Sequence, residues 1–263
     1  MAVGRAHFRE RFSSFPAWNC PHCENGFLKE LPKGRSVTEP IYSKSQRSED
    51  WWEPDHTIAR FAAEMRCTNS TCGECVFVTG HSTIDYYGQD EEGEHWEEIF
   101  EPRAAYPAIP VFRLMEEWPD AVITELRRSF AHIWNDPGAA ANRLRTAVEC
   151  LLDGLRVKKT TLTTKGGVTR RSKLKLHDRI VAFRAMKPDA ADLLLAVKWL
   201  GNAGSHADLA GLTRDHVLDG MEIMEHVLHL LFDKTGQAVT QLAKSINKKK
   251  GPVSKPKNKS MWS

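Results

Sequence analysis

The chain has 263 residues, of which 41% are hydrophobic and 27% are charged, and its net charge is +3. This apolar content can form a core, which argues against extensive disorder, and no apolar run approaches the ~20 residues of a membrane-spanning helix. The first residues lack the apolar stretch of a secretory signal, so we expect a cytoplasmic protein with no membrane partner. In such a protein six cysteines favour metal or thiol chemistry over disulfides.

Residues 1–105 are rich in cysteine, tryptophan, proline and glycine, and we predict that they form a separate cysteine-rich domain. Two pairs of cysteines in this region have spacings typical of metal knuckles. Four thiolates in two pairs suit tetrahedral zinc, which stabilises small domains that lack a large core. We therefore predict a β-type zinc ribbon that holds a structural Zn²⁺ ion. The preferred ligands are Cys20, Cys23, Cys67 and Cys72.

A competing ligand set replaces Cys67 with Cys75, which gives two pairs with the same spacing. Three histidines, at positions 22, 56 and 81, are weaker candidates. Cys-Pro-His-Cys also occurs in thiol oxidoreductases, but the Glu24-Asn-Gly26 turn that follows favours a metal knuckle. A fully cysteine-ligated ion leaves no open position for substrate, so the site is expected to be structural.

Acidic and basic residues are segregated along the chain. The segment 85–101 contains eight acids and no lysine or arginine, whereas the segment 156–187 contains eleven basic residues and one acid. Between them, three prolines in the segment 101–110 interrupt regular structure and mark a domain boundary. The last twenty residues, 244–263, contain seven lysines and no acid, and we predict a disordered basic tail there.

Apolar spacing and capping residues predict five helices after the boundary. A basic loop, 158–172, separates the second helix from the third, and Gly236 is expected to end the last helix. The connections are mostly short, so residues 111–243 should form a bundle of antiparallel helices, and the fold class is predicted to be mainly α. The predicted helices span residues 119–134, 136–156, 174–186, 187–200 and 213–234.

The basic loop and the tail are the predicted contacts with RNA or DNA, because lysine and arginine side chains that neutralise phosphates release bound counterions. The candidate residues in and beside the loop are Lys158, Lys159, Lys165, Arg170, Arg171 and Lys173, and those in the tail are Lys248, Lys249 and Lys250.

Two stretches of the helical region carry polar residues at helical spacing. Arg145 and Glu149 are four residues apart, and Lys198, Asn202 and His206 continue the same spacing on a later helix. At these two stretches the chain resembles a bacterial family catalogued as a domain of unknown function, which occurs alone and attached to restriction-type endonucleases. The helical core of that family is similar to the HEPN superfamily, and an N-terminal zinc ribbon is common in it.

The resemblance implies a HEPN-like helical homodimer. In HEPN ribonucleases a histidine transfers protons and an arginine stabilises phosphate charge without a metal. In this chain His206 and Asn202 match the histidine and the polar position, but Gly201 occupies the expected arginine position. Lys198, Arg143 and Arg145 are the candidates to supply the missing cation, and a dimer mate is a further candidate.

These observations predict a nucleic-acid-associated accessory or phage-defence protein with a zinc ribbon and a non-catalytic HEPN-like bundle. One alternative is a metal-independent endoribonuclease that acts as a dimer through His206 and Asn202, so the sequence leaves open whether the protein is an enzyme. A second alternative is an adaptor that binds a protein partner in a defence system through the ribbon and the acidic segment 85–101.

Overall fold

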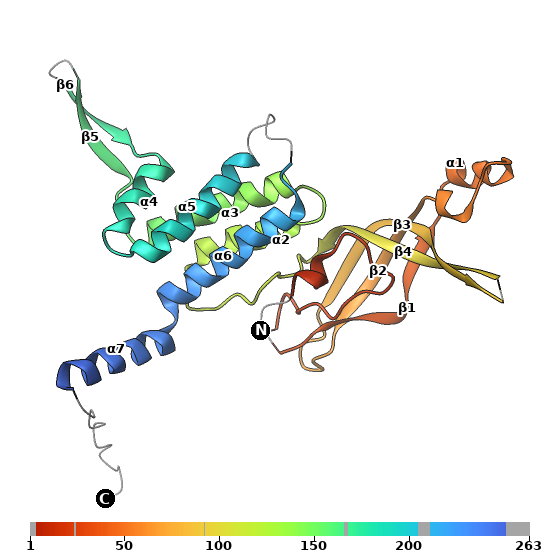
Figure 1. The fold of residues 1–263 in the computed structure, drawn as a ribbon, viewed down its shortest axis with the longest axis horizontal. Coiled ribbons are helices and arrows are strands. Elements are labelled where there is room, and N and C mark those ends of the chain that lie inside the picture. The colour runs from red at the N-terminus through yellow and green to blue at the C-terminus, as the bar shows by residue number, and fades with distance from the viewer. Residues whose placement is uncertain (1–3, 24, 92, 166–167, 205–210, 251–263) are drawn as a thin grey trace, which may run out of the picture.

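The computed structural model describes residues 4–23, 25–91, 93–165, 168–204 and 211–250, with a β-rich N-terminal half beside a helical C-terminal half (Figure 1). Four antiparallel strands form one sheet in the order β1-β2-β3-β4. They span Leu28–Thr38, Ala59–Cys67, Cys75–Asp90 and Gly93–Tyr106. Four short helical turns flank the first strands: η1 at Arg5–Phe8, α1 at Ile41–Lys44, η2 at Ser45–Ser48 and η3 at Pro54–His56.

In the described part of the C-terminal half there are six helices and a second, two-stranded sheet. The helices are α2 (Asp120–Ala131), α3 (Pro137–Gly154), α4 (Leu176–Arg184), α5 (Pro188–Ala203), α6 (Arg214–Phe232) and α7 (Lys234–Lys249). Strands β5 (Thr160–Lys165) and β6 (Val168–Lys173) form a hairpin that projects from the bundle (Figure 1). None of the helices in the described ranges has both the length and the apolar composition that crossing a membrane requires.

The predicted mainly α class is wrong, because helices contain 43% and strands 28% of the structure. The N-terminal half is a four-stranded sheet whose two longest strands, β3 and β4, have 16 and 14 residues. Alternating burial is clear in β2, but in β3 and β4 it fades beyond Ser82, where both faces of the hairpin reach solvent. Without a buried face, the hairpin ends of β3 and β4 lack the apolar alternation that identifies a strand in a sequence.

One hydrophobic core runs through both halves of the molecule. Trp134, which follows α2, stacks on Phe8 at 5.5 Å between ring centroids and meets the edge of Trp18 at 5.6 Å. The Trp134 indole N–H also donates to the carbonyl of Arg9 at 3.2 Å. The segment before β1 therefore packs against the helical half and links it to the sheet, across the domain boundary predicted at the prolines of residues 101–110.

The five predicted helices correspond to α2–α6, with ends that agree within a few residues. The side chain of Asp136 caps α3 by accepting from the backbone N–H of Ala139 at 2.8 Å. Thr213 caps α6 in the same way through the N–H of His216. Both caps satisfy donors that the first turn of a helix leaves free, so the sequence signals have a direct physical basis.

Three predictions for the C-terminal half are wrong, the last of them in part. The basic segment 158–172 is not the expected loop, because most of it forms the β5–β6 hairpin, in which β-branched threonines favour extended structure. Gly236 does not end the last helix, because it lies inside α7, which continues to Lys249. Positions 244–249 of the predicted disordered tail are therefore helical, and residues 251–263 lie outside the described residues.

Candidate metal centre and cationic cleft

Four cysteines converge where the segment before β1 meets the turn between β2 and β3. One ligand atom of each, the Sγ of Cys20, Cys23, Cys67 and Cys72, lies within 4.8 Å of all the others. The Sγ atoms of Cys20 and Cys72 are 3.8 Å apart, and those of Cys23 and Cys67 are 3.5 Å apart. Tetrahedral zinc with Zn–S bonds of ~2.3 Å requires sulfurs about 3.8 Å apart, so this cluster could hold such an ion.

Backbone amides support the sulfurs. The N–H groups of His22 and Cys23 both donate to Cys20 Sγ at 3.4 Å, and the N–H of Asn69 donates to Cys67 Sγ at the same distance. Hydrogen bonds of this kind stabilise thiolates and orient metal ligands. Although burial opposes ionisation of Cys23, hydrogen bonds from Cys67 and the other neighbours lower its pKa to about 6.

Cys67 behaves differently from Cys23, because burial raises the pKa of its thiol to about 12. Four sulfurs at this spacing cannot all carry negative charge without a cation between them. The arrangement of the donors therefore fits a divalent metal ion better than four free thiols.

Cys75 lies outside the cluster. Cys75 is the first residue of β3. Its Sγ is 3.7 Å from the carbonyl oxygen of Gly73 and 3.9 Å from Glu64 Oε1. The structure thus brings together the preferred ligand set and not the set in which Cys75 replaces Cys67.

Sequence reasoning missed Gly26 at this site. A Cβ built on Gly26 would lie 2.2 Å from Cys67 Sγ and 3.0 Å from the Cβ of Asn69. The two knuckles can approach each other only because this residue has no side chain. The Glu-Asn-Gly sequence after Cys23 indicates a turn, but it gives no sign of contact with the second knuckle.

A second candidate site lies in the helical half, at the base of the β5–β6 hairpin. We call it the cationic cleft, and its volume is about 410 Å³. Basic residues outnumber acids among the described residues that line it, of which Glu149 is the one acid. The lining residues are Arg145, Glu149, Lys173, Leu174, Lys175, Leu176, His177, Arg179, Lys198 and Asn202.

Among the described residues, Lys198 and Arg179 are the two buried cations of the cleft. Lys198 is only 7% exposed, and its Nζ lies 3.3 Å from the centroid of the Trp199 ring. Burial, together with the positive charge of Arg145, lowers the pKa of the Lys198 ammonium. Within the described residues no carboxylate forms an ion pair with Lys198, so an anion that entered the cleft would relieve an unbalanced charge.

The other cations of the cleft differ in their partners. Arg145 pairs with Glu149 at 3.3 Å along α3, and its buried Nε has no hydrogen-bond partner among the described residues. Arg179 is neutralised by Asp153 at 2.6 Å, so its charge is already balanced. Arg145 therefore keeps part of its hydrogen-bonding capacity for a ligand.

Gly201, the position where the resemblance expects an arginine, lies at the crossing of α3 and α5. A Cβ there would be 2.5 Å from the Cβ of Arg145 and 2.9 Å from the carbonyl oxygen of Ala141. Any side chain at this position would push the two helices apart. Gly201 thus serves close helix packing, and an arginine could not enter the cleft from it.

The remaining predicted site residues are distributed as follows. Asn202 lines the cleft with Lys198 and Arg145, whereas His206 lies outside the described residues. The predicted nucleic-acid contacts fall in two places. The first is the β5–β6 hairpin with Lys158 and Lys159 just before it, and the second is the end of α7 with Lys248, Lys249 and Lys250. Lys159 pairs with Asp153 at 2.7 Å, and only the backbone of Lys165 is described.

Two family models match the chain, one in the β-rich half and one in the helical half. Residues 8–104 match the model of a domain of unknown function, DUF8608, and residues 127–249 match that of a second domain of unknown function, DUF4145. Searches of curated proteins and of solved structures gave no significant match. The chain therefore contains segments similar to two uncharacterised domain families, one covering the sheet and one covering the helices.

Proposed function

We propose that this protein binds nucleic acid through a continuous basic surface formed by the β5–β6 hairpin and the cationic cleft. The main support for the proposal is the unbalanced positive charge of Lys198. This buried residue lies against the Trp199 ring and near the charge of Arg145, and no carboxylate of the described residues pairs with it. Burial of a charge is costly unless an opposite charge balances it. A phosphate in the cleft would supply that charge.

The hairpin extends the cleft toward solvent. Lys173 ends β6 and also lines the cleft, so the two surfaces meet at this residue. Arg171 faces Leu162 across the hairpin, and Arg170 faces Thr163 in the next pair, so the two arginines project from opposite faces. A two-stranded ribbon fits the major groove of B-form DNA, which is ~12 Å wide, and this favours duplex DNA as the ligand.

In this proposal the ion at the four cysteines is structural Zn²⁺. Its ligands tie the segment that carries Trp18 to the turn between β2 and β3, and that segment in turn packs against Trp134. Zinc would therefore maintain the contact between the sheet and the helical half. The sheet would support the binding surface without contributing to it.

Binding can be tested by fluorescence anisotropy with duplex DNA and with single-stranded RNA over a range of salt concentrations. We expect Lys198→Met to weaken binding about 10-fold, because a charge-assisted hydrogen bond is lost. The matched control is Lys29→Met, at an exposed position of β1 far from the cleft. Binding that is absent at low salt, or equal in the two variants, would contradict the proposal.

A metal-independent ribonuclease is the second candidate, favoured by the presence of Asn202 beside Lys198 and Arg145 in one cleft. The test is cleavage of RNA in excess chelator by the wild type and by His206→Ala. Cleavage by the wild type alone would support catalysis in spite of the packing role of Gly201. Cleavage by neither would leave nucleic-acid binding as the function of the cleft.

A further inference from the structure

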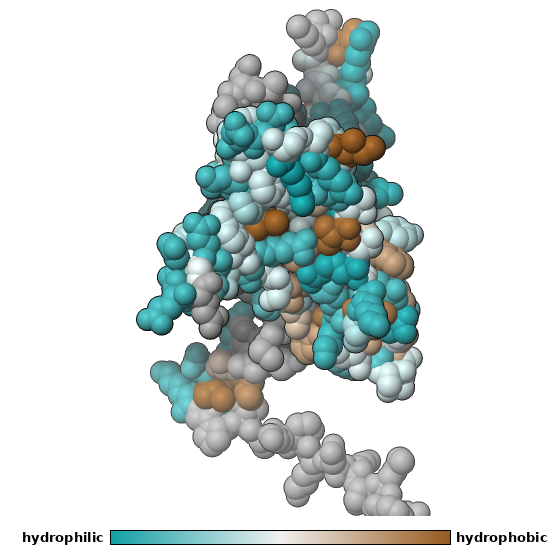
Figure 2. All heavy atoms as spheres, turned by 90° about the vertical axis from the view of Figure 1, so that its right-hand side faces the viewer, coloured by the Kyte–Doolittle hydropathy of each residue, from teal (hydrophilic) through white to brown (hydrophobic). Residues whose placement is uncertain are grey.

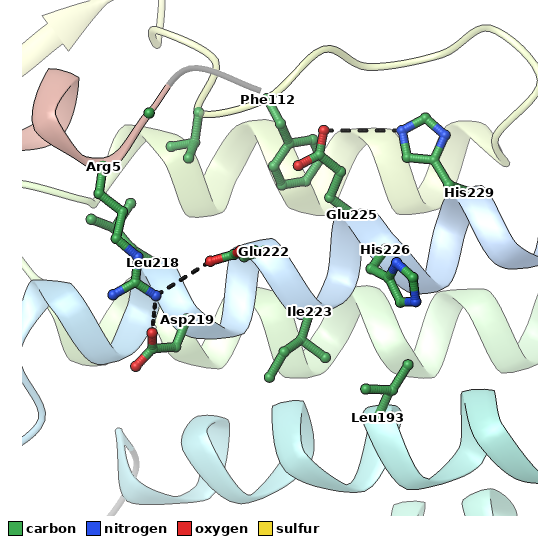
Figure 3. Close-up of a pocket in the computed structure, with 12 residues that line it drawn as sticks. Arg5, Phe112, Leu193, Leu218, Asp219, Glu222, Ile223, Glu225, His226 and His229 are labelled. Atoms are coloured by element: carbon green, nitrogen blue, oxygen red, sulfur yellow. Dashed lines mark hydrogen bonds and ion pairs between the residues drawn. The ribbon is translucent and has the colours of Figure 1, made fainter. Parts of the chain in front are cut away.

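A groove with a volume of about 1050 Å³ lies along α6, and it shares no lining residue with the cationic cleft (Figure 3). Its apolar lining includes the buried Phe112 and Leu218 and the partly buried Leu193 and Ile223. The groove extends along α6 from Leu218 to His229, which at 1.5 Å per residue is about 16 Å.

Acidic residues border this apolar groove. Asp219, Glu222 and Glu225 all project from α6 around it, and Arg5 pairs with the first two. Figure 3 shows Arg5 over Asp219 and Glu222 at one end, with Glu225 and His229 toward the other. Burial and the neighbouring Glu222 raise the pKa of Glu225, so a cation placed here would stabilise its ionised form.

Helix α7 has the complementary chemistry. It contains four lysines and no acid, and Leu242 and Ile246 lie on one face, 51% and 40% exposed. Residues 242–249, the part of α7 whose side chains the structure describes, are all exposed, and the helix projects from the end of α6 (Figure 1). An isolated helix of 16 residues is only marginally stable in water, so α7 needs a surface to cover these apolar side chains.

The connection between α6 and α7 decides which copy of the groove α7 can fill. Only Asp233 separates the two helices, whereas connections between antiparallel neighbouring helices typically have about two to eight residues. We therefore do not expect α7 to fold back along its own α6. The groove of a second copy has no such restriction.

We propose that two copies of this chain form a symmetric dimer. In it, the α7 of each copy occupies the apolar, acid-bordered groove along α6 of the other copy. The arrangement is closed, because each copy both offers a helix and receives one. Leu242 and Ile246 would cover Leu193 and Ile223, while the lysines of α7 would lie near the acids that border the groove. This inference concerns a different surface from the cationic cleft and does not depend on nucleic-acid binding.

The dimer can be tested by light scattering coupled to size-exclusion chromatography on the full chain at 1–100 µM, in 0.3 M salt. We expect the wild type to be a dimer. Leu242→Asp should raise the dimer dissociation constant by at least about 100-fold, because it places a charge in an apolar contact twice per dimer. The control, Asn247→Asp, adds the same charge on a different face of α7 and should leave the dimer intact.

Ile223→Asp tests the groove independently of the stability of α7. It should also give a monomer, with the far-ultraviolet circular dichroism of a folded chain. A wild type that is monomeric at 100 µM, or a Leu242→Asp variant that dimerises as the wild type does, would overturn the proposal.

Disulfide trapping identifies the occupant of the groove. Chains with Ile223→Cys and chains with Leu242→Cys, carrying different tags, should form a mixed disulfide when they are combined. A double variant that forms the bond only within one chain would show that α7 fills its own groove, which would refute exchange between copies. A truncated chain that lacks residues 1–3 should still dimerise, and loss of the dimer on this truncation would assign the groove to the N-terminal segment.

Discussion

Replacing Cys67 and Cys75 by serine, one at a time, separates the two ligand sets that the sequence allows. Cys67 lies within the four-cysteine cluster, whereas the Cys75 Sγ lies beside a carbonyl oxygen, a carboxylate and the Arg66 side chain. We expect Cys67→Ser to lose the metal ion and Cys75→Ser to keep it. Each variant removes one sulfur, so the difference between them reports the geometry and not the number of cysteines.

The size of the effect follows from Trp18, two residues before the first ligand. Its side chain is fully buried and contacts Trp134. A buried tryptophan removes ~150–250 Å² from solvent, which at ~25 cal/mol per Å² corresponds to about 4–6 kcal/mol. If loss of the metal releases this segment, the free energy of unfolding should fall by about that amount. For a chain of this length the melting temperature should fall by roughly 10–20 °C.

The assay combines elemental analysis of the purified protein with thermal unfolding. The wild type should contain one metal ion per chain and should lose stability when a strong chelator is added. Retention of the ion by Cys67→Ser together with its loss from Cys75→Ser would refute the ligand assignment. A wild type without metal, equally stable with and without chelator, would refute the metal site itself.

Three further predictions concern the helical half. Gly201→Ala should reduce the free energy of unfolding by about 1–3 kcal/mol in urea titrations, because its Cβ meets α3, whereas Gly154→Ala, whose nearest neighbour is 3.4 Å away, should change it by less than about 1 kcal/mol. Lys198→Met should stabilise the protein at neutral pH. Because the folded pKa of this lysine is lowered, the wild type gains stability as pH rises toward the unfolded pKa, and in the variant this gain should disappear. Asp153→Ala should cost about 2 kcal/mol, because the buried Arg179 loses its carboxylate partner. Although burial opposes ionisation of Asp153, its ion pairs with Lys159 and Arg179 lower its pKa. In the wild type the stabilisation from these ion pairs is lost as pH falls through the folded pKa of Asp153. The free energies of unfolding of the two proteins should therefore converge in acid.

The predictions that succeeded rest on local chemistry. Asp136 and Thr213 cap helices because a side-chain oxygen satisfies backbone donors within three residues of itself, so the signal lies within a few positions of the chain. The spacing of the cysteines in the two knuckles is equally local. Prediction of the cluster required only that the two knuckles meet.

The wrong fold class and the missed role of Gly201 both depend on contacts between different elements of the structure. The ends of β3 and β4 pair with each other across a hairpin, as Asp85 does with Glu97, and acidic residues in such positions have low strand propensity. The pairing partner, and not the intrinsic preference, determines the structure there. The same holds for Gly201, whose role is visible only beside Arg145 of another helix.

The arrangement of the two hairpins makes the molecule electrically polar along its length. The acidic segment 85–101 lies in the β3–β4 hairpin at one end, and the basic β5–β6 hairpin lies at the other (Figure 1). Figure 2 faces the acidic end and shows mostly hydrophilic residues, with isolated hydrophobic ones between them. In the field of a polyanion such a molecule experiences a torque that turns its basic end inward before contact. If the protein binds nucleic acid as proposed, it would be oriented during diffusion, and fewer encounters would be lost to approach by the wrong end.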